Sequence, residues 1–170
     1  ALGGCTVDPW VAYGPETQTD LEKCSQAGAS PGAGEIFLMG DSHALALLPM
    51  LKSATKTTGQ KLTYSFKGSC FNSASLVPSL KKKPYGPCLD YSLGEFERSF
   101  DRLSSGDSVV IANWFNLYIT DTYVRGKPNT YSYFHDGERI KDHAKVREIY
   151  IKDMRNVAKK LSQKGINLIF

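Results

Sequence analysis

Short apolar runs alternate with helix-like segments along this chain, and that alternation limits the folds it can adopt. Strands are expected at 35–39, 61–66, 107–113 and 166–170, and helices at 44–58, 90–103 and 142–164. Successive apolar strands joined by helices favour a parallel sheet that helices cover on both faces. The sequence therefore predicts an α/β fold with a doubly wound parallel sheet in three layers, α/β/α, of the flavodoxin-like kind.

Length and composition agree with one domain. The 170 residues are 41% hydrophobic and 22% charged, and no apolar run approaches the roughly 20 residues that span a bilayer. Residues 1–34 are rich in glycine and proline and are expected to form an irregular lead-in, whereas 35–170 hold the alternating segments. The net charge of +4 is mild, and the lysine cluster 81–83 is too short to indicate nucleic-acid binding.

The four cysteines fall into two local pairs, Cys5 with Cys24 and Cys70 with Cys88. No C-x-x-C motif is present, so neither a zinc site nor any other metal site is expected. Loop-closure entropy favours disulfides within each pair over disulfides between the pairs. Two such bridges, each contributing about 3 kcal/mol, indicate an extracytoplasmic protein. The alternative is four unpaired thiols in a cytosolic protein.

Polar residues follow three of the expected strands, where parallel sheets bind their ligands. They are Gly40-Asp41-Ser42-His43, Gly68-Ser69-Cys70 and Asn113-Trp114. Ser42 lies between a strand and a helix, so it is either a nucleophile beside a helix N-terminus or the N-cap of that helix. The backbone N–H of Gly68 and the amide of Asn113 are candidate donors to an oxyanion. Taken singly, both are also ordinary turn residues.

The motif GDSH after an apolar strand, with a glycine after the second strand and an asparagine after the third, resembles the SGNH hydrolase superfamily of GDSL lipases and esterases. The turn Gly68-Ser69-Cys70 and the stretch VVIANW make 35–170 most similar to the extracytoplasmic SGNH domains fused behind membrane-embedded acyltransferase-3 proteins. The resemblance implies Ser42 as nucleophile. It also implies an oxyanion hole made of the N–H groups of Ser42 and Gly68 and the side chain of Asn113, with Asn116 as a weaker competitor.

One element of the superfamily pattern is missing from the sequence. No aspartate has a histidine three residues later, so the D-x-x-H motif that supplies the general base is not found. His43 adjoins Ser42 and is expected to shape the turn, His135 to lie in a surface loop, and His143 to be solvated. The chain is therefore expected to be truncated, with the base in a remaining C-terminal part and an exposed apolar face beside 166–170.

The resemblance implies serine-dependent transfer of an acyl group, such as acetyl, to or from a cell-surface polysaccharide, without a cofactor. The expected partners are an acyl donor, the polysaccharide acceptor and a membrane-embedded acyltransferase domain of the same parent protein, with a periplasmic or other extracytoplasmic location. Transferase and esterase remain open. Aromatic residues at 114, 115, 118, 123, 131 and 133 are candidates for stacking on sugar rings, and ordinary loop and core positions are the favoured alternative for them. The alternatives are an inactive carbohydrate-binding module and, less favoured, a flavodoxin-like ligand binder.

Overall fold

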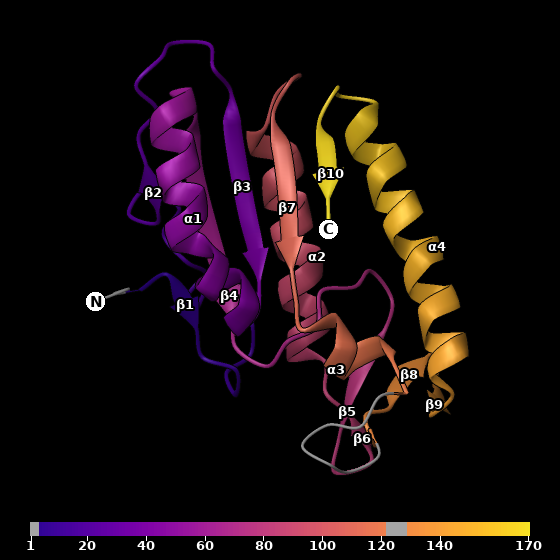
Figure 1. Cartoon of the computed structure of the whole chain (residues 1–170). Coiled ribbons are helices and arrows are strands. Elements are labelled where there is room, and N and C mark those ends of the chain that lie inside the picture. The colour runs from indigo at the N-terminus through magenta and orange to yellow at the C-terminus, as the bar shows by residue number, and fades with distance from the viewer. Residues whose placement is uncertain (1–3, 122–128) are drawn as a thin grey trace.

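The computed structural model describes residues 4–121 and 129–170, and Figure 1 shows a parallel sheet flanked by long helices. The main strands are β3 (Glu35–Gly40), β4 (Lys61–Lys67), β7 (Ser108–Ala112) and β10 (Asn167–Ile169). The helices are α1 (Ser42–Thr58), α2 (Pro87–Arg102), α3 (Phe115–Ile119) and α4 (His143–Ser162). All four expected strands and all three expected helices are therefore present.

The main sheet has the order β4-β3-β7-β10, and all of these neighbours are parallel. The first strand of the series lies in the middle, and the chain moves to one side for β4 and to the other for β7. This order is that of a flavodoxin-like sheet, whose topological switch point falls between β3 and β7. The predicted doubly wound α/β fold is confirmed.

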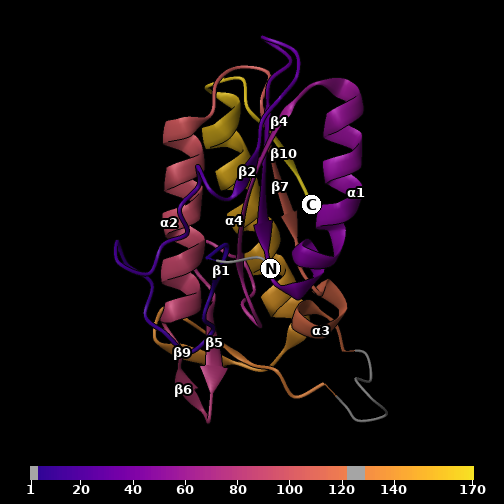
Figure 2. The same cartoon turned by 90° about the vertical axis from the view of Figure 1, so that its left-hand side faces the viewer.

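Side chains of β3 alternate between two cores because successive residues of a strand point to opposite faces. Phe37 and Met39 pack in a cluster with residues of α4, whereas Leu38 packs in a second cluster with Ala44 and Leu48 of α1. Figure 2 shows the corresponding layers, with α1 on one side of the sheet and α2 and α4 on the other. A strand covered on both faces requires the unbroken apolar run seen in the sequence.

The lead-in adds two short strands beside β4. β1 (Thr6–Val7) is parallel to β4, and β2 (Ser25–Gln26) is antiparallel to it. The Cys5–Cys24 disulfide joins the two, and the second disulfide joins Cys70 to Cys88. Both predicted bridges are present.

A second, antiparallel sheet lies beyond the carboxyl ends of β3 and β7 (Figure 1). Its order is β6-β5-β8-β9, and its strands are β5 (Val77–Leu80), β6 (Lys83–Pro84), β8 (Tyr133–His135) and β9 (Glu138–Ile140). The sequence did not indicate this sheet, because β5 pairs with β8 across more than 50 residues (Val77 with Phe134). Such a pairing leaves no local pattern.

The edge of the main sheet at β10 is apolar and exposed. Among the described strands β10 pairs only with β7, and Ile169 and Phe170 are 52% and 61% exposed. This agrees with the exposed apolar face expected beside 166–170.

Gly40 ends β3 where the sheet is most crowded. Its φ is 153°, and a Cβ placed there would lie 1.9 Å from the carbonyl oxygen of Ala112 and 2.8 Å from Cβ of Ala44. Only glycine lets β3 approach β7 this closely before the chain turns into α1. The residue thus fixes the start of the candidate site.

We predict that Gly40→Ala lowers the free energy of unfolding by about 3 kcal/mol or more, because the added methyl group meets backbone. Gly32→Ala is the matched control: Gly32 also has a positive φ of 80°, but a Cβ there has nothing within 4 Å. That variant gains only backbone strain, which should lower its free energy of unfolding by about 1 kcal/mol. Urea denaturation measures both. Equal losses would show that the contact with Ala112 does not require the glycine.

Candidate active site

The carboxylate of Asp41 organises the turn between β3 and α1. Asp41 is 1% exposed; its Oδ1 accepts the N–H of His43 at 2.8 Å, and its Oδ2 accepts the N–H of Trp114 at 3.1 Å. The first hydrogen bond caps α1, and the second ties the turn to the residue that follows β7 and Asn113. One buried side chain therefore holds two strand ends together.

Ser42 is the first residue of α1 and is exposed. The cap is Asp41, so the alternative role of Ser42 as N-cap is wrong. No residue that the structure describes hydrogen-bonds to the Ser42 hydroxyl. Its backbone N–H belongs to the first turn, where helices have no internal acceptor and the helix dipole is positive. Ser42 thus presents a free hydroxyl beside a free donor.

Strand register brings the other two predicted residues to the same edge. Gly40 lies opposite Phe66 of β4 and Ala112 of β7, so the residues that come next along each strand leave the sheet side by side. Gly68 follows two residues after Phe66, and Asn113 one residue after Ala112. The structure therefore places Ser42 and Asn113 at the switch point, and Gly68 at the same edge of the sheet, after the neighbouring strand β4.

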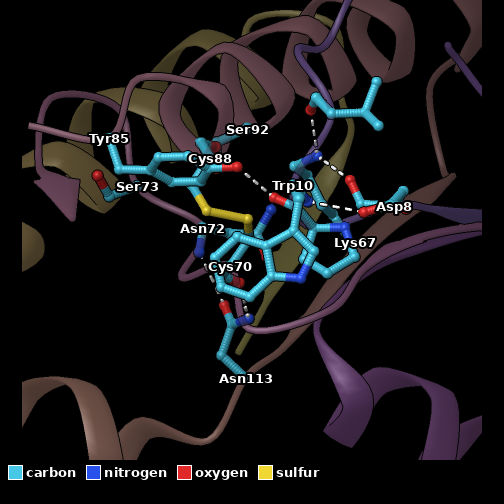
Figure 3. The surroundings of a disulfide bond; sticks show 12 residues. Asp8, Trp10, Lys67, Cys70, Asn72, Ser73, Tyr85, Cys88, Ser92 and Asn113 are labelled. Atoms are coloured by element: carbon cyan, nitrogen blue, oxygen red, sulfur yellow. Dashed lines mark hydrogen bonds between the residues drawn. A yellow bond between two sulfur atoms is a disulfide. The ribbon is translucent and has the colours of Figure 1, made fainter. Parts of the chain in front are cut away.

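Asn113 is 6% exposed and ties down the loop that follows β4 (Figure 3). Its Nδ2 donates to the carbonyl of Cys70 at 3.1 Å, and its Oδ1 accepts the N–H of Asn72 at 3.2 Å. The amide nitrogen has two hydrogens, so one remains for an oxyanion. The Cys70–Cys88 disulfide anchors the same loop to the first turn of α2.

Of the six aromatic candidates for sugar stacking, three lie in or against the core. Tyr118 and Tyr133 are 2% and 0% exposed, and Phe115 packs against the same cluster. Burial, and then the Asp41 carboxylate, raise the pKa of Tyr118, which keeps its hydroxyl neutral beside Asp41. Trp114 and Tyr131 are 36% and 38% exposed. Tyr123 lies outside the described residues.

The three histidines hold structural positions. His43 stacks on Trp114 with ring centroids 5.2 Å apart, and its Nδ1 lies 3.5 Å from Asp41 Oδ1. His143 was expected to be solvated, but it is 2% exposed, with Nε2 2.9 Å from the carbonyl of Tyr131 and Nδ1 3.2 Å from Asp121 Oδ1. The sequence does not show that Tyr131 and Asp121 lie against the start of α4, so the solvated position was wrong.

His135 takes part in a Ser–His–Asp cluster that sequence reasoning missed. The Ser75 hydroxyl donates to Asp153 Oδ2 at 2.8 Å and lies 3.1 Å from His135 Nδ1. A nucleophilic serine must give its proton to histidine, whereas this one gives it to the carboxylate. The cluster therefore ties β8 to α4, and His135 is half-buried in it instead of lying free on a surface loop.

Fold and site together define an α/β protein with an exposed serine, a glycine loop and a buried asparagine at the switch point of its sheet. The family model described as "SGNH domain (fused to AT3 domains)" matches residues 10–170, and the chain belongs to this family. The match confirms the resemblance and begins inside the lead-in, 25 residues before 35. No curated protein matches the chain.

The family match indicates the broad functional class of the chain. The family places the chain among proteins of acyltransferase or esterase type. The two disulfides and the family are consistent with an extracytoplasmic domain. Within residues 4–121 and 129–170, no helix has the length and hydropathy needed to cross a membrane.

Asp41→Asn tests the double role of the carboxylate. We predict a loss of about 1–3 kcal/mol in the free energy of unfolding, because an amide has one acceptor oxygen and the N–H of Trp114 loses its partner. Asp142→Asn is the matched control, since Asp142 caps α4 through Oδ1 alone. It should lose about 0.5 kcal/mol or less, because asparagine caps as well as aspartate. Equal losses in chemical denaturation would contradict the bridging role.

Proposed function

We propose that this domain transfers an acyl group, such as acetyl, to or from a cell-surface polysaccharide through an acyl-enzyme on Ser42. The observation that carries the proposal is the free hydroxyl of Ser42 at the N-terminus of α1, next to the loop that Asn113 holds. Serine attacks the acyl carbonyl, the leaving group departs with a proton, and a sugar hydroxyl or water then takes the acyl group.

The proposed oxyanion hole consists of the N–H groups of Ser42 and Gly68 and the side chain of Asn113. Donors of this kind stabilise the negative charge that develops on the carbonyl oxygen during attack. The two hydrogen bonds of Asn113 to the loop support this role, because they fix its amide before substrate arrives. Fixed dipoles cost no reorganisation during the reaction.

We propose that the general base comes from a part of the parent protein beyond these 170 residues. The chain contains no D-x-x-H motif, and each of its three histidines has a partner among the described residues. His43 also follows Ser42 directly, and neighbouring residues of a helix do not face each other. A membrane-embedded acyltransferase domain of the same parent is the proposed partner that supplies acyl groups, with the site in the periplasm or another extracytoplasmic space.

A second candidate function is carbohydrate binding without catalysis. The missing base motif favours it, because a serine hydroxyl is a weak nucleophile until a neighbour takes its proton. The two functions differ in whether Ser42 reacts covalently.

Covalent labelling of the full-length parent protein decides between them. We predict that a fluorophosphonate labels Ser42 and that Ser42→Ala abolishes the label while leaving the fold intact. Ser53→Ala, which removes an exposed hydroxyl further along α1, is the control and should retain the label. Mass spectrometry of the digested protein locates the adduct. A folded parent protein that takes up no label would favour the binding module.

Asn113→Ala tests the oxyanion hole. We predict a loss of about 100-fold in turnover of an acetyl ester, because a donor to the transition state is removed. The free energy of unfolding should also fall by about 1–3 kcal/mol, because the carbonyl of Cys70 and the N–H of Asn72 lose their partners. Asn116→Ala is the comparison. If Asn116→Ala alone lowered turnover, Asn116 and not Asn113 would be the donor.

A further inference from the structure

A hollow of about 160 Å³ lies beside the loop that follows β4. Gly68, Ser69 and Cys70 form one wall, and three aromatic residues from distant parts of the chain, Trp10, Tyr85 and Tyr131, line the rest together with β5. Pockets for drug-sized molecules begin at roughly 300 Å³, so this one has room for a single small ring. It is also the place where the lead-in, the second sheet and the candidate site meet.

Two of the three aromatic side chains of the hollow are exposed. Trp10 is 68% exposed and meets the ring of Tyr85 edge-on, with centroids 6.2 Å apart. Tyr131 is 38% exposed on another wall. Tryptophan and tyrosine combine a large apolar face with a polar group, a combination that suits a ligand with one apolar face and a polar rim.

Hydrogen bonds from the side chains of Lys67 and Tyr85 hold the backbone of the segment that carries Trp10 (Figure 3). The Lys67 ammonium, 0% exposed, donates to the carbonyls of Asp8 at 2.6 Å and Val11 at 2.9 Å. The Tyr85 hydroxyl donates to the carbonyl of Pro9 at 2.5 Å. Burying an ammonium group is costly unless it is hydrogen-bonded, and both printed hydrogen bonds of Lys67 go to this segment. A fixed aromatic wall loses little entropy when it binds a ligand.

Two sets of contacts connect the hollow to the candidate site. The carbonyl of Cys70, a residue of the hollow, accepts the hydrogen bond from Asn113. On the other wall, Tyr131 packs edge-on against Tyr118 with centroids 5.7 Å apart, and Tyr118 lies beside Asp41. A ligand in the hollow therefore lies next to the proposed oxyanion donors.

We infer that the hollow is the subsite that binds one pyranose ring of the polysaccharide acceptor, an inference that rests on the proposed function. A pyranose has a face of C–H groups that packs on an aromatic ring, and hydroxyl groups around its edge that remain hydrated or bind polar groups such as the Ser69 hydroxyl. Trp10 and Tyr131 are the binding residues, and Lys67 is a positioning residue that acts through the 8–11 segment. The bound ring places a neighbouring sugar hydroxyl toward Ser42.

Ligand-observed saturation-transfer NMR tests this subsite with the methyl pyranosides of glucose, galactose, rhamnose and N-acetylglucosamine. At least one should show transfer strongest at the C–H protons of one ring face. Trp10→Ala and Tyr131→Ala should each weaken its affinity about fivefold or more, and Trp10→Phe should restore part of it. Met50→Ala, which removes a 60% exposed side chain from α1, should change nothing.

Other outcomes overturn the inference. They are no transfer to any pyranoside, transfer that Trp10→Ala and Tyr131→Ala leave unchanged, or transfer only to sodium octanoate, which would mark the hollow as an acyl-chain site. Fluorophosphonate labelling of Ser42 separates this result from the proposed function. Labelling without pyranoside binding would defeat the subsite alone, whereas binding without labelling would defeat the acyl-enzyme and leave the subsite standing.

Discussion

The two hydrogen bonds of the Asp41 carboxylate set the geometry on which the candidate site depends. One caps α1 and the other holds the N–H of Trp114, so the ends of β3 and β7 cannot separate without breaking one of them. Because Asp41 is the N-cap of α1, Ser42 is not needed to cap the helix. Gly40, which precedes Asp41, allows β3 to come close enough to β7 for these hydrogen bonds to form.

The strand order explains why three short motifs far apart in sequence form one site. β3 lies in the middle of the sheet with β4 on one side and β7 on the other, so the segments after all three strands emerge together. The lead-in then closes the far side of the site, because buried Lys67 at the end of β4 binds its backbone. Site and lead-in are therefore one structural unit.

The sequence patterns predicted the features that depend on residues close together in the chain. Four strands, three long helices and two disulfides between near neighbours follow from apolar periodicity and short loop closure. The second sheet and the burial of His143 depend on contacts between remote segments that leave no periodic signal. The sequence left open whether Ser42 was a nucleophile or the N-cap, because serine is a common cap residue and the local pattern does not show that Asp41 caps instead. Trp10 lies in the irregular lead-in, and no sequence pattern around it indicates that its side chain lines a hollow beside the candidate site.

The Cys70–Cys88 bridge bears on how thiol sensitivity of such a domain is interpreted. The bridge closes a separation of 18 residues and fixes the loop that contains Gly68. Reduction of the Cys70–Cys88 bridge would release that loop from α2. The Cys5–Cys24 bridge lies in another part of the chain and does not hold this loop. Loss of activity in a reducing buffer would then resemble the behaviour of an enzyme with a redox-active cysteine, although sulfur takes no part in the proposed chemistry. A newly made chain would likewise hold this loop against α2 only after the Cys70–Cys88 bridge has formed.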